Sequence, residues 1–459
     1  MDLDYLLVIP SWKSVGILVT FFTYLAIAGS VLPAKLVPGV TLQDGSRLHY
    51  RCNGLFSMLL LVLLLGVGAK MELLSLTVIS ERGLELLSAT FIFSFLVALA
   101  LYAAGSKSRN QSSSLKPCVT GNLIHDWYSR RLTRSKRFQF EWFGIQLNPS
   151  FLGIDLKFFF VRSGMMGWLF INLSVLAKAI QGATLSHSMI LYQIFCLIYI
   201  LDYFFYEEYM TSTWDIIAER LGFMLVFGDL VWIPFTFSIQ ASDCSGKSFA
   251  SNRGILFVIE AVAWSLFRSS LALFGMMGWW LLGNKVELTT AAVIANCFVF
   301  LLGYLVFRGA NKQKHVFKKN PKALIWGKPP KVVGGKLLAS GYWRFELTMF
   351  SSEERCSYHL GHASTPVLMD YDYNCIVAVV EGSGGVARHC NYLGDLLLAL
   401  SFSLPCGISS PVPYFYPIYL LILLIWRERR DEARCAEKYK EVWMEYRRLV
   451  PWRILPYFY

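Results

Sequence analysis

The sequence predicts an all-α polytopic membrane protein with about eight to ten transmembrane helices. Hydrophobic residues make up 55% of the 459 residues and charged residues only 16%, and the mean hydropathy is +0.47. These values depart from those of soluble globular domains. Several apolar stretches are long enough to cross about 30 Å of hydrocarbon as helices. Composition and stretch length together exclude an ordinary soluble fold.

Eight apolar segments are expected to be membrane helices, and they cover 15–32, 55–74, 86–104, 164–181, 188–206, 221–239, 254–282 and 290–307. Two more passes fit within 393–425, separated by a break at 403–413 that contains proline and glycine. Such a break is either a plain hairpin or a place where freed backbone groups build a site. Acidic Asp2 and Asp4 precede the first span, which we therefore interpret as a retained helix and not a cleaved signal peptide.

Two cationic clusters lie outside the predicted spans. Residues 308–336 contain nine Lys or Arg and no Asp or Glu, and the second cluster is Arg427, Arg429 and Arg430. The positive-inside tendency places such segments in the cytosol, so the net charge of +12 indicates cytosolic exposure and lipid headgroup contact, not nucleic-acid binding. Two clusters on one face are also suited to clamping the phosphates of a dinucleotide.

Three patterns resemble disulfide, dinucleotide-binding or metal sites but lack features that such sites need. The ten cysteines form no C-x-x-C pair, which indicates reduced thiols and neither a disulfide framework nor a zinc ribbon. The run GSGGVA at 382–387 fits G-x-G-x-x-A, but a membrane span follows it where a dinucleotide fold needs a βαβ unit. Cys356, His359 and His362 have ligand-like spacing but no convincing fourth ligand, so no metal site is expected.

Ionisable residues also occur beside apolar helices. Four acids accompany the end of the predicted span 188–206, namely Asp202, Glu207, Glu208 and Asp215. A carboxyl group desolvated there is a candidate proton donor, and the alternative is that the acids mark the helix exit into water. Asp155, Lys157 and Arg162 flank an aromatic run, and we expect them to pair with one another at a helix start.

Several motifs together resemble the sterol reductase family, whose members include delta-14 and delta-7 sterol reductases and the membrane domain of lamin B receptor. In the C-terminal part they are RHCNYLGD at 388–395, SLPCG at 403–407, PYFYPIY at 413–419, RERRDEARCAEKY at 427–439 and LPYFY at 455–459. The upstream motifs GNLIHDW, GIQLNP and DLKFFFVRSGMMGW extend the resemblance over most of the chain, and they are most similar to the plant-type delta-14 branch.

The resemblance implies an enzyme of the endoplasmic reticulum membrane that reduces the delta-14 double bond of a sterol with NADPH. An unactivated alkene accepts hydride poorly, so it has to be protonated first to a tertiary carbocation, which hydride then quenches. The protein must therefore supply an acid, a dry pocket and a cofactor clamp. The expected partners are the sterol and the lipid bilayer, and the many aromatic residues, such as Trp168, suit either interfacial belts or a flat sterol pocket.

The resemblance also implies which residues form the site. The expected cofactor residues are Lys314, Lys318, Trp343, Arg388, His389, Asn391, Tyr392, Asp395, Arg427, Arg430 and Asp431. The basic ones would bind phosphates, Asn391 and Asp395 would hydrogen-bond ribose or nicotinamide, and Trp343 would stack on a ring. The expected proton donor is one of Tyr203, Glu207 and Tyr414, with Asp202 and Asp215 as further alternatives.

The predicted organisation has four parts. Residues 1–307 hold the N-terminal helices and the sterol pocket, 308–343 the basic cytosolic loop, 344–384 an atypical insertion, and 385–459 the C-terminal NADPH-binding region. The segments 128–141, 241–277 and 344–384 each interrupt a sequence motif that is otherwise continuous and resembles the family. This suggests retained non-coding sequence or alternative splicing. Deleting all three is expected to give an equally or more active reductase, because loop insertion has a small entropic cost and the segments are expected to be dispensable.

Three other functions stay open at this point. Delta-7 reduction is the nearest enzymatic alternative. A non-catalytic sterol-binding scaffold is the second, although only a short segment precedes the first span where such a role needs a long basic domain. A transporter is the third, and it is expected to show paired repeats with broken helices in both halves, whereas one broken region and no repeat are visible.

Overall fold

The computed structural model consists mainly of helices, with three two-stranded hairpins in its described part. It describes residues 10–39, 47–107, 148–236 apart from 152 and 218, 286–320 and 387–459 apart from 457, with a few short stretches between 281 and 338. The predicted all-α membrane class is confirmed. The predicted span 254–282 lies almost wholly outside the described residues. The three interruptions and Trp343 lie outside them entirely.

Five described helices are long and apolar enough to cross a membrane: α1 (Trp12–Val31), α4 (Gly83–Lys107), α6 (Leu156–Gln181), α7 (His187–Phe205) and α12 (Thr290–Lys319). Three shorter apolar helical segments are α2 (Gly54–Lys70), α9 (Phe223–Phe227) with the π-helix η3 (Gly228–Thr236), and α13 (Cys390–Ser403). Each corresponds to one of the predicted spans.

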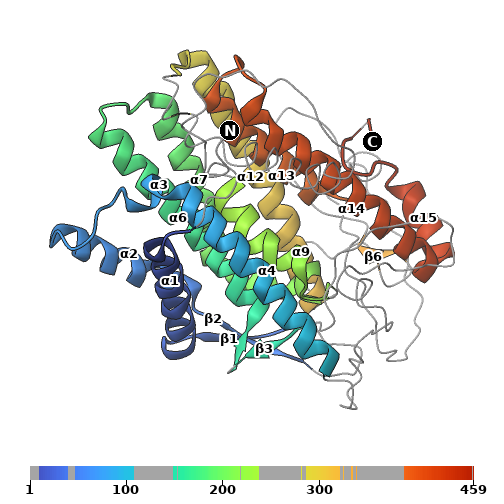
Figure 1. Ribbon diagram of the computed structural model, residues 1–459. Helices are drawn as coiled ribbons and strands as arrows, with labels where there is room; N and C mark the ends of the chain where they lie inside the picture. The colour runs from blue at the N-terminus through green and yellow to red at the C-terminus, as the bar shows by residue number, and fades with distance from the viewer. Residues whose placement is uncertain are drawn as a thin grey trace, which may run out of the picture. The chain divides into compact units, whose positions relative to one another are not determined.

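The chain forms two compact units. Unit 1 comprises Met1–Phe300 with Leu398–Leu420, and unit 2 comprises Leu301–Leu397 with Leu421–Tyr459. Helix α6 is the centre of unit 1, where it contacts α1, α7, η3 and the short α3 (Val78–Glu81) (Figure 1). Gly164 permits the contact with η3, since a Cβ at this position would overlap the main-chain oxygen of Asp229.

Short elements connect the helices of unit 1. Strands β1 (Lys35–Pro38) and β2 (His49–Cys52) pair antiparallel after α1, and the 3-10 helix η2 (Glu207–Ser212) contacts both. The other short elements are β3 (Ser150–Phe151), β4 (Ile154–Asp155), α8 (Trp214–Ile217), η4 (Leu404–Cys406) and η5 (Val412–Tyr414). The predicted break at 403–413 is a hairpin closed by Ser403, whose hydroxyl donates to the Pro413 main-chain oxygen at 2.8 Å.

Unit 2 contains most of α12, the start of α13 and most of α14 (Phe415–Tyr439). It also contains α15 (Glu441–Leu449) and the hairpin of β5 (Val332–Val333) and β6 (Leu337–Leu338). Helix α12 continues to Lys319, so the first part of the predicted basic loop is helical. The helix ends before Pro321, because the residue preceding a proline disfavours the α conformation.

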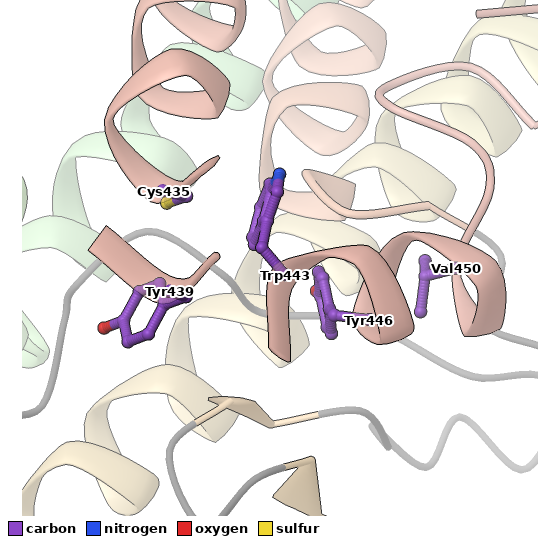
Figure 2. Close-up of a cluster of buried hydrophobic side chains, with 5 residues drawn as sticks. All are labelled: Cys435, Tyr439, Trp443, Tyr446 and Val450. Atoms are coloured by element: carbon purple, nitrogen blue, oxygen red, sulfur yellow. The ribbon is translucent and has the colours of Figure 1, made fainter. Parts of the chain in front are cut away.

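A cluster of buried side chains joins α14 to α15. It consists of Cys435, Tyr439, Trp443, Tyr446 and Val450 (Figure 2). The rings of Trp443 and Tyr446 stack with centroids 5.2 Å apart. This cluster fixes the direction in which the C-terminal segment leaves α15.

Candidate functional site

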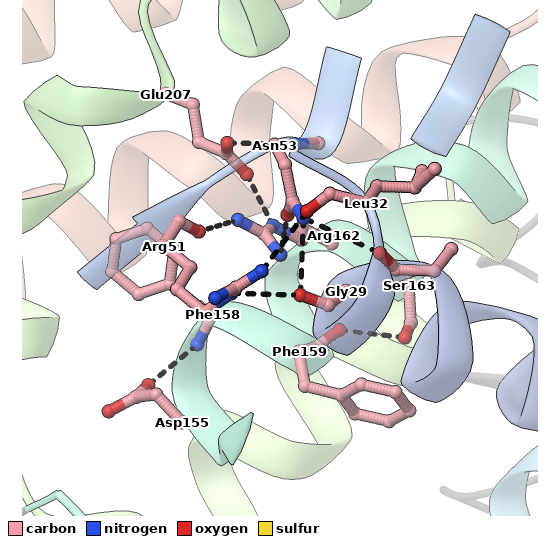
Figure 3. Close-up of polar contacts among 12 residues, drawn as sticks. Gly29, Leu32, Arg51, Asn53, Asp155, Phe158, Phe159, Arg162, Ser163 and Glu207 are labelled. Atoms are coloured by element: carbon pink, nitrogen blue, oxygen red, sulfur yellow. Dashed lines mark hydrogen bonds and ion pairs between the residues drawn. The ribbon is translucent and has the colours of Figure 1, made fainter. Parts of the chain in front are cut away.

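The guanidinium group of Arg162 lies inside unit 1, where three residues hold it (Figure 3). Its Nε donates to Glu207 Oε1 in an ion pair, its Nη1 donates to Asn53 Oδ1 at 3.0 Å, and its Nη2 donates to the main-chain oxygen of Arg51. Buried charges are tolerated when they are paired and hydrogen-bonded, and both charges here meet that condition.

The same network joins the end of α1 and the start of α2 to the start of η2, where Glu207 is the first residue. Glu207 Oε2 accepts a hydrogen bond from the N–H of Gly54, the first residue of α2, at 3.0 Å. The Asn53 amide donates to the main-chain oxygens of Gly29 and Leu32 at 3.1 and 3.2 Å, at the end of α1. Helix ends leave backbone groups without intrahelical partners, and these side chains satisfy some of them. Both oxygens of the Glu207 carboxylate therefore have partners within the fold.

The start of α6 differs from the expected pairing of Asp155, Lys157 and Arg162. Asp155 caps the N-terminus of α6 with its carboxylate. The buried Lys157 ammonium donates to the main-chain oxygens of Asp215 and Glu219, around α8. The expected pairing rested on the spacing of these residues along one helix. The side chains of Lys157 and Arg162 instead reach acceptors on other segments.

Two of the expected proton donors have buried hydroxyl oxygens. Tyr203 lies one turn before Glu207, and no described residue forms a hydrogen bond with its hydroxyl group. Glu207 and Arg162 act on Tyr203 electrostatically. The hydroxyl group of Tyr414, in η5, also has no hydrogen-bond partner within the described ranges. Buried polar groups normally have partners, so both hydroxyl groups are available to a ligand or to water.

Aromatic rings surround the turn of α7 that precedes Tyr203. The ring of Tyr199 lies 5.7 Å from Trp168 and 5.9 Å from Phe402, and these two meet edge-on at 5.8 Å. Trp168 is 0% exposed within unit 1. Trp168 therefore belongs to an interior aromatic cluster and not to an interfacial belt.

In unit 2, close packing brings two helices of the expected cofactor site together. A Cβ at Gly394 would lie 2.5 Å from the main-chain nitrogen of Phe307, so glycine permits α13 to approach α12. Asn391 and Asp395 lie one turn apart at the start of α13, and α12 carries Lys314.

Positive charges gather around His389 in unit 2. Burial lowers the pKa of His389 to about 3, and the charges of Arg388, Lys314 and Arg427 add to the effect. The imidazole is therefore neutral at pH 7, and it stacks on Tyr392 with ring centroids 4.8 Å apart. Several cations within electrostatic reach of one side chain mark a region suited to an anionic ligand.

Arg388 and Gln313 are among the buried side chains of unit 2 that have polar atoms without a hydrogen-bond partner in the described residues. Arg388 Nη1 donates to the Val450 main-chain oxygen at 3.2 Å and Nη2 lies 3.6 Å from Glu432 Oε1, but no described residue accepts from Nε. The buried side-chain amide of Gln313, on α12, likewise has no hydrogen-bond partner in the described chain. These polar groups are available to hydrogen-bond a ligand, and the Arg388 Nε is suited to an anionic one.

Comparison with known proteins decides the family. Residues 1–273 and 373–459 match the ergosterol biosynthesis ERG4/ERG24 family. The chain belongs to this family. It is 60% identical over 459 residues to the Delta(14)-sterol reductase of Arabidopsis thaliana, with 100% of both chains covered.

More distant relatives of this ERG4/ERG24 family member carry related names. It is 34% identical to the Delta(14)-sterol reductase of Methylotuvimicrobium alcaliphilum, over 98% of this chain and 84% of the relative. It is also 34% identical to the Delta(14)-sterol reductase TM7SF2 of Mus musculus, over 98% and 86%. The family resemblance recognised in the sequence is confirmed.

Several of the expected cofactor residues of this ERG4/ERG24 family member interact with one another electrostatically. Arg427 acts electrostatically on both His389 and Asp395. Arg430 Nε lies 3.7 Å from Asp431 Oδ1, and Asp431 is buried. Lys318 belongs to α12, but its side chain is outside the described part, as is the whole of Trp343.

Four residues outside the expected set lie around Arg388 and His389. Glu432 pairs with Arg388, the Arg453 main-chain oxygen accepts from His389, and Glu428 and Tyr459 contact Arg453. Arg453 Nη1 lies 3.4 Å from Glu428 Oε2 and Nη2 lies 3.1 Å from Glu432 Oε2. The spacing of four between the two glutamates on one helix was a usable signal for a shared face. Nothing in the spacing indicated that Arg453, beyond α15, folds back onto them.

Proposed function

We propose that this chain reduces the delta-14 double bond of sterol biosynthesis intermediates with NADPH. The observation that carries the proposal is the 60% identity, over the full length of both chains, to the Delta(14)-sterol reductase of Arabidopsis thaliana. The names of the bacterial and mouse relatives support the same reaction. The multi-pass helices suit a substrate that partitions into the bilayer, and we expect the enzyme in the endoplasmic reticulum membrane.

We assign the proton donor to Tyr203. Its hydroxyl oxygen is buried, has no hydrogen-bond partner among the described residues, and follows the turn of α7 that packs on Trp168. Glu207 suits this role less because Arg162 and the Gly54 N–H engage both of its oxygens. Tyr414 is the second choice. Aromatic faces near the acid would also favour the transient sterol cation.

The cofactor residues belong to unit 2. Lys314, Arg388 and Arg427 would bind phosphates, while Asn391 and Asp395 would hydrogen-bond ribose or nicotinamide. When bound, NADPH supplies the hydride. The cation cluster favours NADPH over NADH, because the 2′-phosphate adds a dianionic partner worth about 1 to 3 kcal/mol in charge-assisted hydrogen bonds.

Purified protein given a delta-14 sterol and either NADPH or NADH tests this proposal. The expected result is loss of the delta-14 double bond by mass spectrometry, with turnover at low nucleotide concentration much faster for NADPH. A matched delta-7 sterol serves as the control substrate. Exclusive turnover of the delta-7 sterol would favour the other branch of the family, and sterol binding without turnover of either would favour a scaffold.

A further inference from the structure

The segment after α15 returns to the start of α13 and pairs with it. The main-chain nitrogen of Arg388 donates to the Trp452 oxygen, and that of His389 donates to the Arg453 oxygen, both at 2.9 Å. All four residues belong to unit 2. The position of the Arg388–His389 main chain therefore depends on where residues 452 and 453 lie.

Tyr459 in turn fixes Arg453 through both its main chain and its side chain. The main-chain oxygen of Tyr459 accepts from the N–H groups of Arg453 and Ile454 at 2.7 and 3.0 Å. The Arg453 guanidinium lies 5.3 Å from the centroid of the Tyr459 ring, and its Nη1 donates to the hydroxyl oxygen at 3.3 Å. A cation over an aromatic face and a hydrogen bond at its edge restrain the arginine in orientation as well as in position.

The Tyr459 hydroxyl group is fully used. It donates to Glu428 Oε2 at 3.2 Å and accepts from Arg429 Nε at 3.2 Å as well as from Arg453. One donated and two accepted hydrogen bonds are the capacity of a hydroxyl group. Tyr459 is thus anchored to α14 on one side and to Arg453 on the other.

One carboxylate of α14, that of Glu432, contacts both Arg453 and Arg388. Glu432 is shared by Arg453 at 3.1 Å, Arg447 at 3.3 Å and Arg388 at 3.6 Å. Because one carboxylate serves three guanidinium groups, displacement of Arg453 would let Glu432 move closer to Arg388. The Arg388 guanidinium would then change its orientation. Its buried Nε, which has no acceptor among the described residues, would no longer point in its present direction.

We propose that Tyr459 is a positioning residue for the cofactor site, which orients Arg388 and His389 by holding Arg453 in place. This inference rests on the proposed function, since it assumes that Arg388 and His389 contact NADPH. The hydroxyl group of Tyr459 is taken up by Glu428, Arg429 and Arg453, so its effect is expected on cofactor affinity and not on the chemical step.

The full-length chain, purified in detergent, tests the proposal with three variants. Tyr459→Phe removes the hydroxyl contacts and keeps the ring over Arg453, Tyr459→Ala removes both, and Phe458→Ala is the matched control because its side chain is 90% exposed. NADPH binding is measured without sterol by nucleotide fluorescence, and KM and kcat are then measured with sterol.

We expect Tyr459→Phe to weaken NADPH binding about tenfold and Tyr459→Ala to weaken it further, with kcat at saturating NADPH within about twofold of wild type. Phe458→Ala should match wild type. Wild-type affinity in both Tyr459 variants would overturn the positioning role, and so would a lower kcat with unchanged KM, which places the loss in the chemical step or in the active fraction and not in cofactor affinity. Absence of NADPH binding by the wild type would instead overturn the proposed cofactor, and the positioning role with it.

Discussion

Arg162 and Glu207 form a buried ion pair in unit 1 between residues 45 positions apart in the chain (Figure 3). Their side chains are only 10% and 3% exposed. Such a pair does not by itself indicate high stability, because both charges lose their hydration. The pair instead specifies one arrangement of α1, α2, α6 and η2, since any other arrangement leaves a charge buried without a partner.

Breaking this pair from one side is expected to destabilise the protein strongly. Glu207→Leu alone leaves the buried Arg162 guanidinium without its carboxylate, and Arg162→Met alone leaves the buried Glu207 carboxylate without its guanidinium. Each is expected to cost about 3 to 5 kcal/mol of stability. The double variant should recover part of the loss, because neither charge remains. Thermal unfolding of the four proteins in detergent measures the coupling. Additive effects of the two substitutions would show that the residues do not act as a pair.

Tyr203→Phe is expected to abolish most of the reduction while leaving the fold intact. The hydroxyl group has no hydrogen bond within the described residues, so its removal should change the unfolding temperature little. Loss of a general acid lowers kcat by about 10²- to 10⁴-fold. Sterol turnover and NADPH binding measured side by side check this, with Tyr414→Phe as the matched variant. A normal kcat in Tyr203→Phe, with a large loss in Tyr414→Phe, would reassign the proton donor.

Gly394→Ala is expected to weaken cofactor binding and lower stability together. The new methyl group would meet the main chain of Phe307 at 2.5 Å, and a backbone contact of this kind has to be relieved by moving α13 away from α12. Overpacking typically costs about 1 to 3 kcal/mol. Gly66→Ala on α2 is the matched control, since a Cβ there meets nothing within 4 Å. Equal unfolding temperatures for the two variants would argue against the close helix contact.

His389 is expected to make the fold sensitive to acid. Its pKa falls from the ordinary value of 6.5 to about 3 in the folded chain, chiefly through burial, so the unfolded chain binds this proton more readily. The contribution of the neutral imidazole is therefore fully present above about pH 6.5 and is lost as the pH falls towards 3. Unfolding temperatures of wild type and His389→Asn, recorded from pH 8 to pH 4.5, should converge or cross as the pH falls. Parallel curves of unfolding temperature against pH for the two proteins would contradict a lowered pKa of His389 in the folded chain.

The membrane class and the positions of the helices could be predicted from hydrophobic length alone. The predicted spans 15–32 and 188–206, for example, correspond to α1 and α7 within a few residues. The end of α12 was predicted less well, because the helix continues through polar residues to Lys319 where hydropathy places a loop. Hydropathy reports where a chain leaves the bilayer, whereas backbone hydrogen bonding and Pro321 decide where the helix ends.

Composition, apolar length and motif order are local properties, so the membrane class, the family and the cluster of cations in the last part of the chain could be predicted without a structure. Which partners those charges have depends on how the chain folds. Glu207 looked like a candidate acid, but its partner Arg162 lies 45 positions away, and Tyr459 appeared only as the end of a motif until Arg453 was seen against its ring. Charge pairing depends on distance in space, and distance between remote segments is set by packing of the whole unit rather than by spacing along the chain.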